Sequence, residues 1–149
     1  MTKINISGKN ILIIGKPASG KTFLANKLAE ENPSHHVIHT DDYQKYGYER
    51  ALYVLLSELP TITKPTIIEG VLGYRLLRKG AQTGVYKPDI VVLLDIPDAL
   101  MINTYKRERP GKDHTALKSF TRSLETILDG YRKIPNATPP LFLTLENSY

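Results

Sequence analysis

Short runs of consecutive apolar residues alternate along the chain with segments in which apolar residues recur every three or four positions. The runs predict five β-strands, at residues 10–14, 37–39, 66–69, 89–94 and 141–145. The periodic segments predict five helices, at residues 20–31, 48–59, 71–79, 98–107 and 115–133. Runs such as Ile11-Leu12-Ile13-Ile14 have no polar face, as expected for parallel strands covered by helices on both sides. The pattern therefore predicts an α/β fold with a five-stranded, mostly parallel sheet flanked by helices.

The 149 residues fit a single domain spanning residues 1–149, because prolines mark the ends of predicted elements and no long linker is visible. The apolar runs are too short to cross a bilayer, and the first residues lack the apolar stretch of a signal peptide. The chain has no cysteine, which excludes disulfides and thiolate metal sites. We therefore expect a cytoplasmic protein without membrane contact, and the oligomeric state stays open.

The charge balance is basic, with 20 Lys and Arg against 15 Asp and Glu, or a net charge of +5. Phosphorylated partners suit this balance. The basic residues are spread along the chain rather than clustered, so a nucleic-acid footprint and a solvated basic surface stay equally open.

The segment Gly15-Lys16-Pro17-Ala18-Ser19-Gly20-Lys21-Thr22 is a complete G-x-x-x-x-G-K-T loop between a predicted strand and a predicted helix. Its glycines allow the backbone amides to converge on phosphate oxygens, and the helix directs its positive end at them. Lys21 is expected to reach the β- and γ-phosphates, and the Thr22 hydroxyl to bind magnesium. The loop thus predicts ATP and Mg2+ as cofactors. Hydrolysis, switching and phosphoryl transfer all use such a loop, so other residues must decide among them.

Two carboxylates, Asp41 and Asp42, follow the second predicted strand, at the place where open α/β sheets bind ligands. In a kinase, a carboxylate orients the acceptor hydroxyl and takes its proton, and Asp41 is the predicted base. The alternative is that one of the two caps the next helix or turn, and Asp42 is the better candidate for that role.

Together with the phosphate loop, Glu31-Asn32-Pro33 and Asp41-Asp42-Tyr43 resemble the start of the 5′-polynucleotide kinases, and small P-loop nucleoside and nucleotide kinases share a looser form. The resemblance implies a three-layer P-loop kinase fold, with Asp41 as general base. It also implies transfer of the γ-phosphoryl group of ATP to a hydroxyl of DNA, RNA or a nucleotide-like acceptor, including a modified base in DNA. Gln44 stands where those kinases carry an arginine that holds the acceptor's phosphate. A nucleoside or another small molecule is therefore the alternative acceptor.

A further acidic residue, Glu69, ends the predicted strand 66–69 and is the expected partner of Thr22 in holding the metal. Asp95, directly after strand 89–94, is the rival. In similar kinases an acid at the position of Asp95 is usually structural, which favours Glu69.

The basic run Lys106-Arg107-Glu108-Arg109-Pro110-Gly111-Lys112 follows a predicted helix and has the composition of a mobile lid near residues 106–114. In kinases with this layout, lid arginines neutralise charge on the transferred group, so Arg107 and Arg109 are catalytic candidates. Cations at the negative end of a helix explain the same residues without a catalytic role.

Other features of the sequence carry less. Tyrosines interleaved with cations at residues 43–53 suit stacking on a nucleobase, although core packing and surface tyrosines explain them as well. Arg75 and Arg78 suit either an acceptor phosphate or a solvated helix face. The four histidines have no metal-ligand spacing, so no zinc site is predicted. The chain has no guanine-reading Asn/Thr-Lys-x-Asp motif, which argues against a regulatory GTPase, and a non-kinase P-loop ATPase stays an alternative.

Overall fold

Five strands form one sheet: β1 (Ile11–Gly15), β2 (His36–His39), β3 (Thr66–Glu69), β4 (Ile90–Asp95) and β5 (Leu141–Glu146). The computed structural model describes residues 5–15, 20–95, 107, 129–134 and 140–146. Within them the strand order is β2-β3-β1-β4-β5, and all four strand pairs are parallel. All carboxyl ends of the strands therefore lie at the same edge of the sheet.

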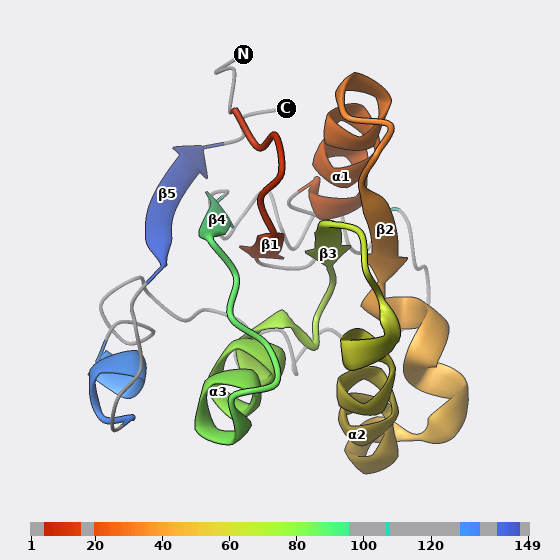
Figure 1. The fold of residues 1–149 in the computed structure, drawn as a ribbon, viewed down its shortest axis with the longest axis vertical. Helices are drawn as coiled ribbons and strands as arrows, with labels where there is room; N and C mark the ends of the chain where they lie inside the picture. Colours follow the sequence, from red (N-terminus) through yellow and green to blue (C-terminus); the bar gives the residue numbers. More distant parts are fainter. Residues whose placement is uncertain (1–4, 16–19, 96–106, 108–128, 135–139, 147–149) are drawn as a thin grey trace.

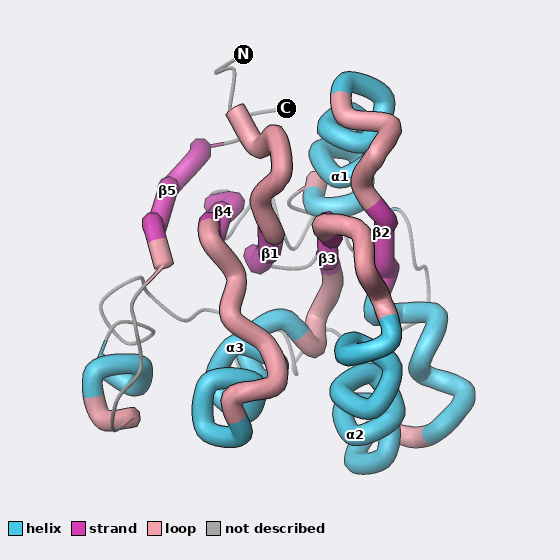
Figure 2. Tube along the Cα trace, viewed as in Figure 1, coloured by secondary structure: helices cyan, strands magenta, loops and turns pink. Residues whose placement is uncertain are grey.

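Helices cover both faces of this sheet. They are α1 (Lys21–Glu31), α2 (Tyr48–Glu58) and α3 (Gly73–Thr83), with the short 3-10 helices η1 (Thr40–Tyr46) and η2 (Leu59–Thr61) on either side of α2. In Figure 1 the central strands β1, β3 and β4 are seen foreshortened, with α1 above the sheet and α2 and α3 below it, and Figure 2 shows the same three layers by element type. In the part of the chain that the structure describes, no helix combines the length and apolarity needed to cross a membrane.

The two faces of the central strand β1 bury separate apolar clusters. Ile11 and Ile13 pack with Leu28 and other residues of α1, whereas Leu12 and Ile14 face the side of α2 and α3. All four β1 side chains have 0% exposure. Because burying one such side chain stabilises by roughly 1.5–3 kcal/mol, β1 is a rigid base for the loop that follows it.

The predicted fold class is confirmed, and each predicted strand agrees with the structure to within one residue. The third helix begins at Gly73 rather than at residue 71. A Cβ on Gly73 would lie only 2.1 Å from Cγ2 of Ile14, so the first turn of this helix packs closely on β1. That helix continues to Thr83 and ends at Gly84, whose φ of 73° is left-handed. The 3-10 helix η1 was not predicted. The predicted helices 98–107 and 115–133 lie mostly outside the described residues. Of these two segments the structure describes residues 107 and 129–133, and residues 107 and 129–132 are helical.

Candidate active site

Three strand ends meet at the carboxyl edge of the sheet, which is where open α/β sheets bind their ligands. β1 ends at Gly15, β2 at His39 and β3 at Glu69. Glu69 is in register with His39 on one side and with Ile13 on the other. The nucleotide loop after β1 and the acidic segment after β2 therefore start on either side of Glu69.

The two ends of the predicted phosphate loop are described, and residues 16–19 between them lie outside the described residues. Gly20, directly before α1, has φ 93° and ψ 20°, a left-handed conformation that favours glycine. The first turn of α1 carries no acidic side chain, so no carboxylate there competes with a bound anion for the helix's positive end. Lys21 is 8% exposed, and its Nζ donates to the carbonyl oxygen of Gly15 at 3.2 Å. The hydrogen bond from Lys21 thus joins the start of α1 to Gly15, the first residue of the loop.

Glu69 is a buried carboxylate at the centre of this edge, with 3% exposure. The Thr22 hydroxyl donates to its two oxygens, at 3.2 Å from Oε1 and 3.3 Å from Oε2. Nδ1 of His39 lies 2.7 Å from Oε2. Thr22 belongs to the first turn of α1, so this carboxylate joins the helix after the phosphate loop to the ends of β2 and β3.

The chemistry of the Thr22 hydroxyl and the Glu69 carboxylate suits a magnesium site, and their role as metal ligands stays a prediction. Hydroxyl and carboxylate oxygens are ligands that Mg2+ prefers, and this ion keeps several waters, so few protein ligands suffice. Among the described residues Glu69 is a buried carboxylate, which is costly without positive charge close by, and a divalent cation would supply such charge. In the same residues no cluster of three or more His, Cys, Asp or Glu side chains forms a complete metal cage.

A close contact between the chain segments after β2 and β3 fixes the surroundings of Glu69. Thr40 has 0% exposure, and its Oγ1 accepts a hydrogen bond from the Leu72 N–H at 3.5 Å. Gly70 turns the chain with φ 137°, and a Cβ on it would lie 1.8 Å from Oγ1 of Thr40. Only glycine fits this turn. Asp41 and Glu69 are the chain neighbours of Thr40 and Gly70, so the contact positions both.

Asp41 lies in the first turn of η1, directly after buried Thr40, and its side chain is exposed. Among the described residues it makes no hydrogen bond or ion pair, which leaves both carboxylate oxygens open to a substrate. The alternative capping role is wrong for both acids, because the N-cap of η1 is His39 and that of α2 is Gly47. Asp41 and Asp42 instead follow the cap. The role of Asp41 as general base remains a prediction.

The structure describes one of the two predicted lid arginines. Arg107 is helical and exposed, and Arg109 lies outside the described residues. Arg75 of α3 pairs with Glu49 of α2 at 3.7 Å, and Arg78 is exposed, as a solvated helix face would be. The rival acid Asp95 ends β4, where its backbone is paired with β5 rather than with the Glu69 strand.

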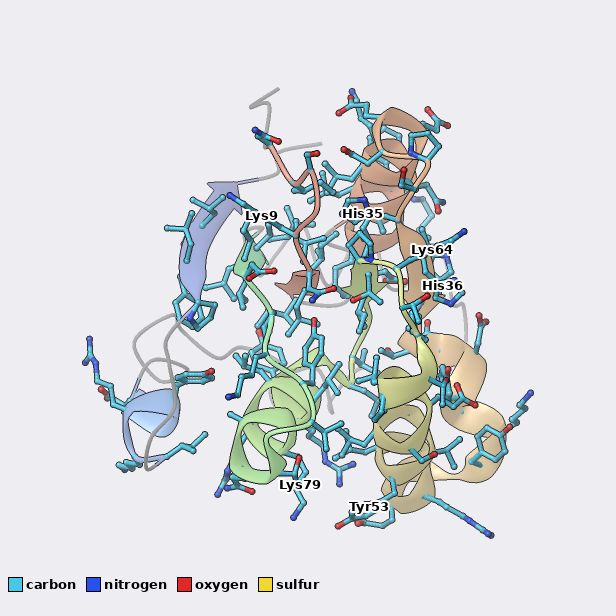
Figure 3. The ribbon with its side chains drawn as sticks, viewed as in Figure 1. Lys9, His35, His36, Tyr53, Lys64 and Lys79 are labelled. Carbon is cyan, nitrogen blue, oxygen red and sulfur yellow. The ribbon has the colours of Figure 1, made fainter. Side chains whose placement is uncertain are left out.

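Of the tyrosines at residues 43–53, Tyr43 and Tyr46 line a cavity, whereas Tyr53 lies on the outer surface. Tyr43 donates a short hydrogen bond to Glu58, and burial raises the pKa of the Tyr43 phenol above its ordinary value. Its ring lies 6.3 Å from that of Tyr46, tilted by 41°. Tyr53 is 55% exposed, with the Lys79 ammonium 6.0 Å from its ring centroid; Figure 3 shows both on the outer side of α2 and α3. Tyr53 is thus a surface tyrosine, as the alternative interpretation predicted.

The cavity beside Tyr43 has a volume of about 260 Å³ and lies along the edge strand β2. Its lining comes from β2, η1 and the end of α2: His36, Val37, Ile38, His39, Asp42, Tyr43, Lys45, Tyr46 and Glu58. His39 belongs both to this lining and to the contact with Glu69. The cavity therefore adjoins the candidate metal site.

Similar solved structures include two small kinases. A gluconokinase from Sinorhizobium meliloti 1021 aligns with a TM-score of 0.59 over 95% of this chain and 84% of its own, at 13% identity. Shikimate kinase from Acinetobacter baumannii, in complex with shikimate, aligns with a TM-score of 0.62 over 97% and 86%, at 18% identity. Neither the scan against family models nor the search of curated proteins finds a match.

The five-stranded parallel sheet, flanked by helices and preceded at β1–α1 by the phosphate-loop sequence, is thus the fold of small P-loop kinases. At these identities the likeness establishes the fold. The narrower resemblance to the 5′-polynucleotide kinases stays a prediction from residues 15–43.

One residue of this site, His39, was missed by the sequence reasoning, which looked for histidines at metal-ligand spacings. The usable signal was its place at the end of β2, one residue before the acidic segment. Parallel strands bring their carboxyl ends together, so a titratable residue at such an end is a candidate for the same site.

Proposed function

We propose that this protein is an ATP-dependent kinase that transfers the γ-phosphoryl group to a hydroxyl of a small molecule. The observation that carries the proposal is the contact of Thr22, the last residue of the phosphate-loop motif, with the buried carboxylate of Glu69. It joins a nucleotide loop to an acid on the neighbouring strand, and the exposed Asp41 follows the next strand along.

On the nucleotide side, the amides of residues 15–22 and the positive end of α1 bind the phosphates, and Lys21 neutralises charge on the β- and γ-phosphates. Thr22 and Glu69 would hold Mg2+, which when bound offsets the negative charge of the phosphates. Burial strengthens these interactions, because charges act over a lower effective dielectric constant inside a protein than in water.

On the acceptor side, the carboxylate of Asp41 accepts a hydrogen bond from the acceptor hydroxyl and orients its oxygen toward the γ-phosphorus. The acceptor oxygen forms the new P–O bond as the bond between the γ-phosphorus and the bridging oxygen of ADP breaks. The hydroxyl proton passes to Asp41. Arg107 and Arg109 are the proposed lid residues that stabilise charge on the transferred group.

A small acceptor is favoured over a nucleic acid, because similar structures include a gluconokinase and a shikimate kinase with shikimate bound. Gln44, in place of the arginine expected from the polynucleotide kinases, points the same way. A nucleic-acid acceptor is the second candidate, favoured by the Asp41-Asp42-Tyr43 motif and the net charge of +5.

The test is incubation of the full chain and Mg2+ with ATP labelled on the γ-phosphate and a panel of acceptors. The panel holds small polyhydroxy acids, nucleosides, oligonucleotides with free 5′-hydroxyls and hydroxymethylated DNA. Label in a small acceptor supports the proposal, whereas label in an oligonucleotide supports the second candidate. Transfer to a nucleic acid should also weaken steeply with salt, through counterion release. Release of labelled phosphate at the same rate with every acceptor would mean an ATPase, and no turnover would mean a binding module; either result overturns the proposal.

A further inference from the structure

His39 and Glu69 face each other at matched positions of two paired strands. β2 and β3 are parallel and in register at this pair, so the two side chains project from the same face of the sheet. The distance of 2.7 Å between Nδ1 and Oε2 is that of a charge-assisted hydrogen bond. An ionised carboxylate only accepts, so Nδ1 is assigned as the ring nitrogen that carries the hydrogen and donates it.

The carboxylate of Glu69 is gripped by donors from two different elements. His39 donates from the end of β2, and the Thr22 hydroxyl donates from the first turn of α1 at longer distances, 3.2 and 3.3 Å. The Glu69 side chain is 4% exposed, against 31% for His39. With His39 in place, the carboxylate is therefore held by protein donors rather than by bulk water.

We infer that His39 is a positioning residue, which holds Glu69 in the orientation needed to bind the metal beside Thr22; this rests on the proposed kinase function. His39 itself does not bind the metal. Hydrogen bonds of this kind fix the direction of a ligand carboxylate before the metal arrives, and their loss typically weakens metal affinity or activity roughly 10- to 100-fold.

The conservative replacement at this position is asparagine rather than glutamine. In Asn, Nδ2 is separated from Cα by the same number of bonds as Nδ1 in His, so its amide N–H can donate to Oε2 from nearly the same place. His39→Ala removes the donor, and His39→Asn keeps it while removing the rest of the ring. If His39 only fills space, the His39→Ala and His39→Asn variants should have the same metal affinity. If His39 positions Glu69, the His39→Asn variant should keep the wild-type metal affinity.

The experiment measures binding of Mn2+, as a probe for the metal site, to the full chain with a non-hydrolysable ATP analogue, by electron paramagnetic resonance. His39→Ala is expected to weaken Mn2+ affinity roughly 10- to 100-fold, with His39→Asn close to the wild type. Affinity for the analogue without metal should not change. His36→Ala is the matched control, because His36 is on the same strand, is exposed (Figure 3) and is in register with Thr66 rather than with Glu69.

Unchanged Mn2+ affinity in His39→Ala, or equal losses in the Ala and Asn variants, overturns the inference while leaving the kinase proposal intact. A wild-type chain that binds neither the analogue nor Mn2+ overturns both. If His39→Ala fails to fold, His39→Gln takes its place, because its amide lies one bond further from Cα and cannot donate to Oε2 from the same position. His39→Gln should then weaken Mn2+ affinity relative to His39→Asn. Equal affinities of the Gln and Asn variants contradict the inference.

Discussion

Gly70→Ala should destabilise the fold strongly, because it places a methyl group against the residue that precedes Asp41. Two costs add. A non-glycine residue at the Gly70 φ of 137° is strained by about 1–3 kcal/mol. The new Cβ would lie 1.8 Å from Thr40 Oγ1, and overpacking of a buried site costs about 1–3 kcal/mol more. The expected loss of unfolding free energy is therefore about 2–6 kcal/mol.

Gly84→Ala is the matched control for this prediction. Gly84 also has a positive φ, 73°, but a Cβ there would meet nothing within 4 Å. Only the left-handed backbone strain applies, about 1–2 kcal/mol. Equilibrium urea denaturation of the two variants and the wild type measures the difference, and the thermal midpoint gives a second reading. Both variants place an alanine at a positive φ, so a large excess loss in Gly70→Ala reports the contact with Thr40.

The same comparison reaches the proposed activity. If both variants are folded, Gly70→Ala should lower phosphoryl transfer well below Gly84→Ala, since Glu69 and Asp41 flank the disturbed contact. Equal unfolding free energies for Gly70→Ala and Gly84→Ala would falsify the reasoning, because Thr40 and Gly70 would then not be tightly packed. Equal activities with unequal stabilities would separate the packing from the catalytic arrangement.

Three further changes test other parts of the structure. Asp41→Asn should lower kcat roughly 10²- to 10⁴-fold with ATP affinity retained, whereas Asp42→Asn should not; similar kcat values in the two variants contradict the assignment of the base. Lys21→Ala should weaken ATP binding roughly 10- to 100-fold in a fluorescence titration, through the lost charge-assisted bonds. Tyr86→Phe should stabilise by about 1 kcal/mol in urea denaturation, because the buried Tyr86 hydroxyl has no hydrogen-bond partner among the described residues. Burial also raises the Tyr86 pKa from its ordinary value of 10.0. Above pH 10 this tyrosine therefore ionises in the unfolded state before it ionises in the folded state, and the unfolding free energy of the wild type falls relative to that of Tyr86→Phe.

The sheet was predictable because its strands are apolar on consecutive residues. β1 and β4 have no polar residue before their last positions, and that pattern has few explanations other than burial on both faces. The start of α3 was less predictable than the starts of α1 and α2. Gly73 packs against Ile14, 59 positions earlier in the sequence, and local periodicity contains no information on that contact. The seven residues of η1 are polar or aromatic, so no apolar residues recur at helical spacing from which this 3-10 helix could be predicted.

The candidate site divides along the same line. The phosphate loop was predictable because its chemistry needs particular residues at fixed local spacing, and Glu69 was a candidate because it ends an apolar strand at the edge where open α/β sheets bind ligands. His39 was missed since its role depends on a partner 30 residues away and on the register between β2 and β3. A shift of that register by one residue would point the two side chains to opposite faces.

Asp41 is exposed, yet it does not depend on a flexible loop for its place. The residue before it, Thr40, is fully buried against Gly70, and the residue after β3's end is that same glycine. His39, one residue earlier, is bonded to Glu69. The acceptor side and the metal side of the proposed reaction therefore share one rigid junction between β2 and β3. A base on a solvent-exposed turn can keep its distance from the phosphate loop because the two residues before it are fixed to the strand that also holds the metal ligand.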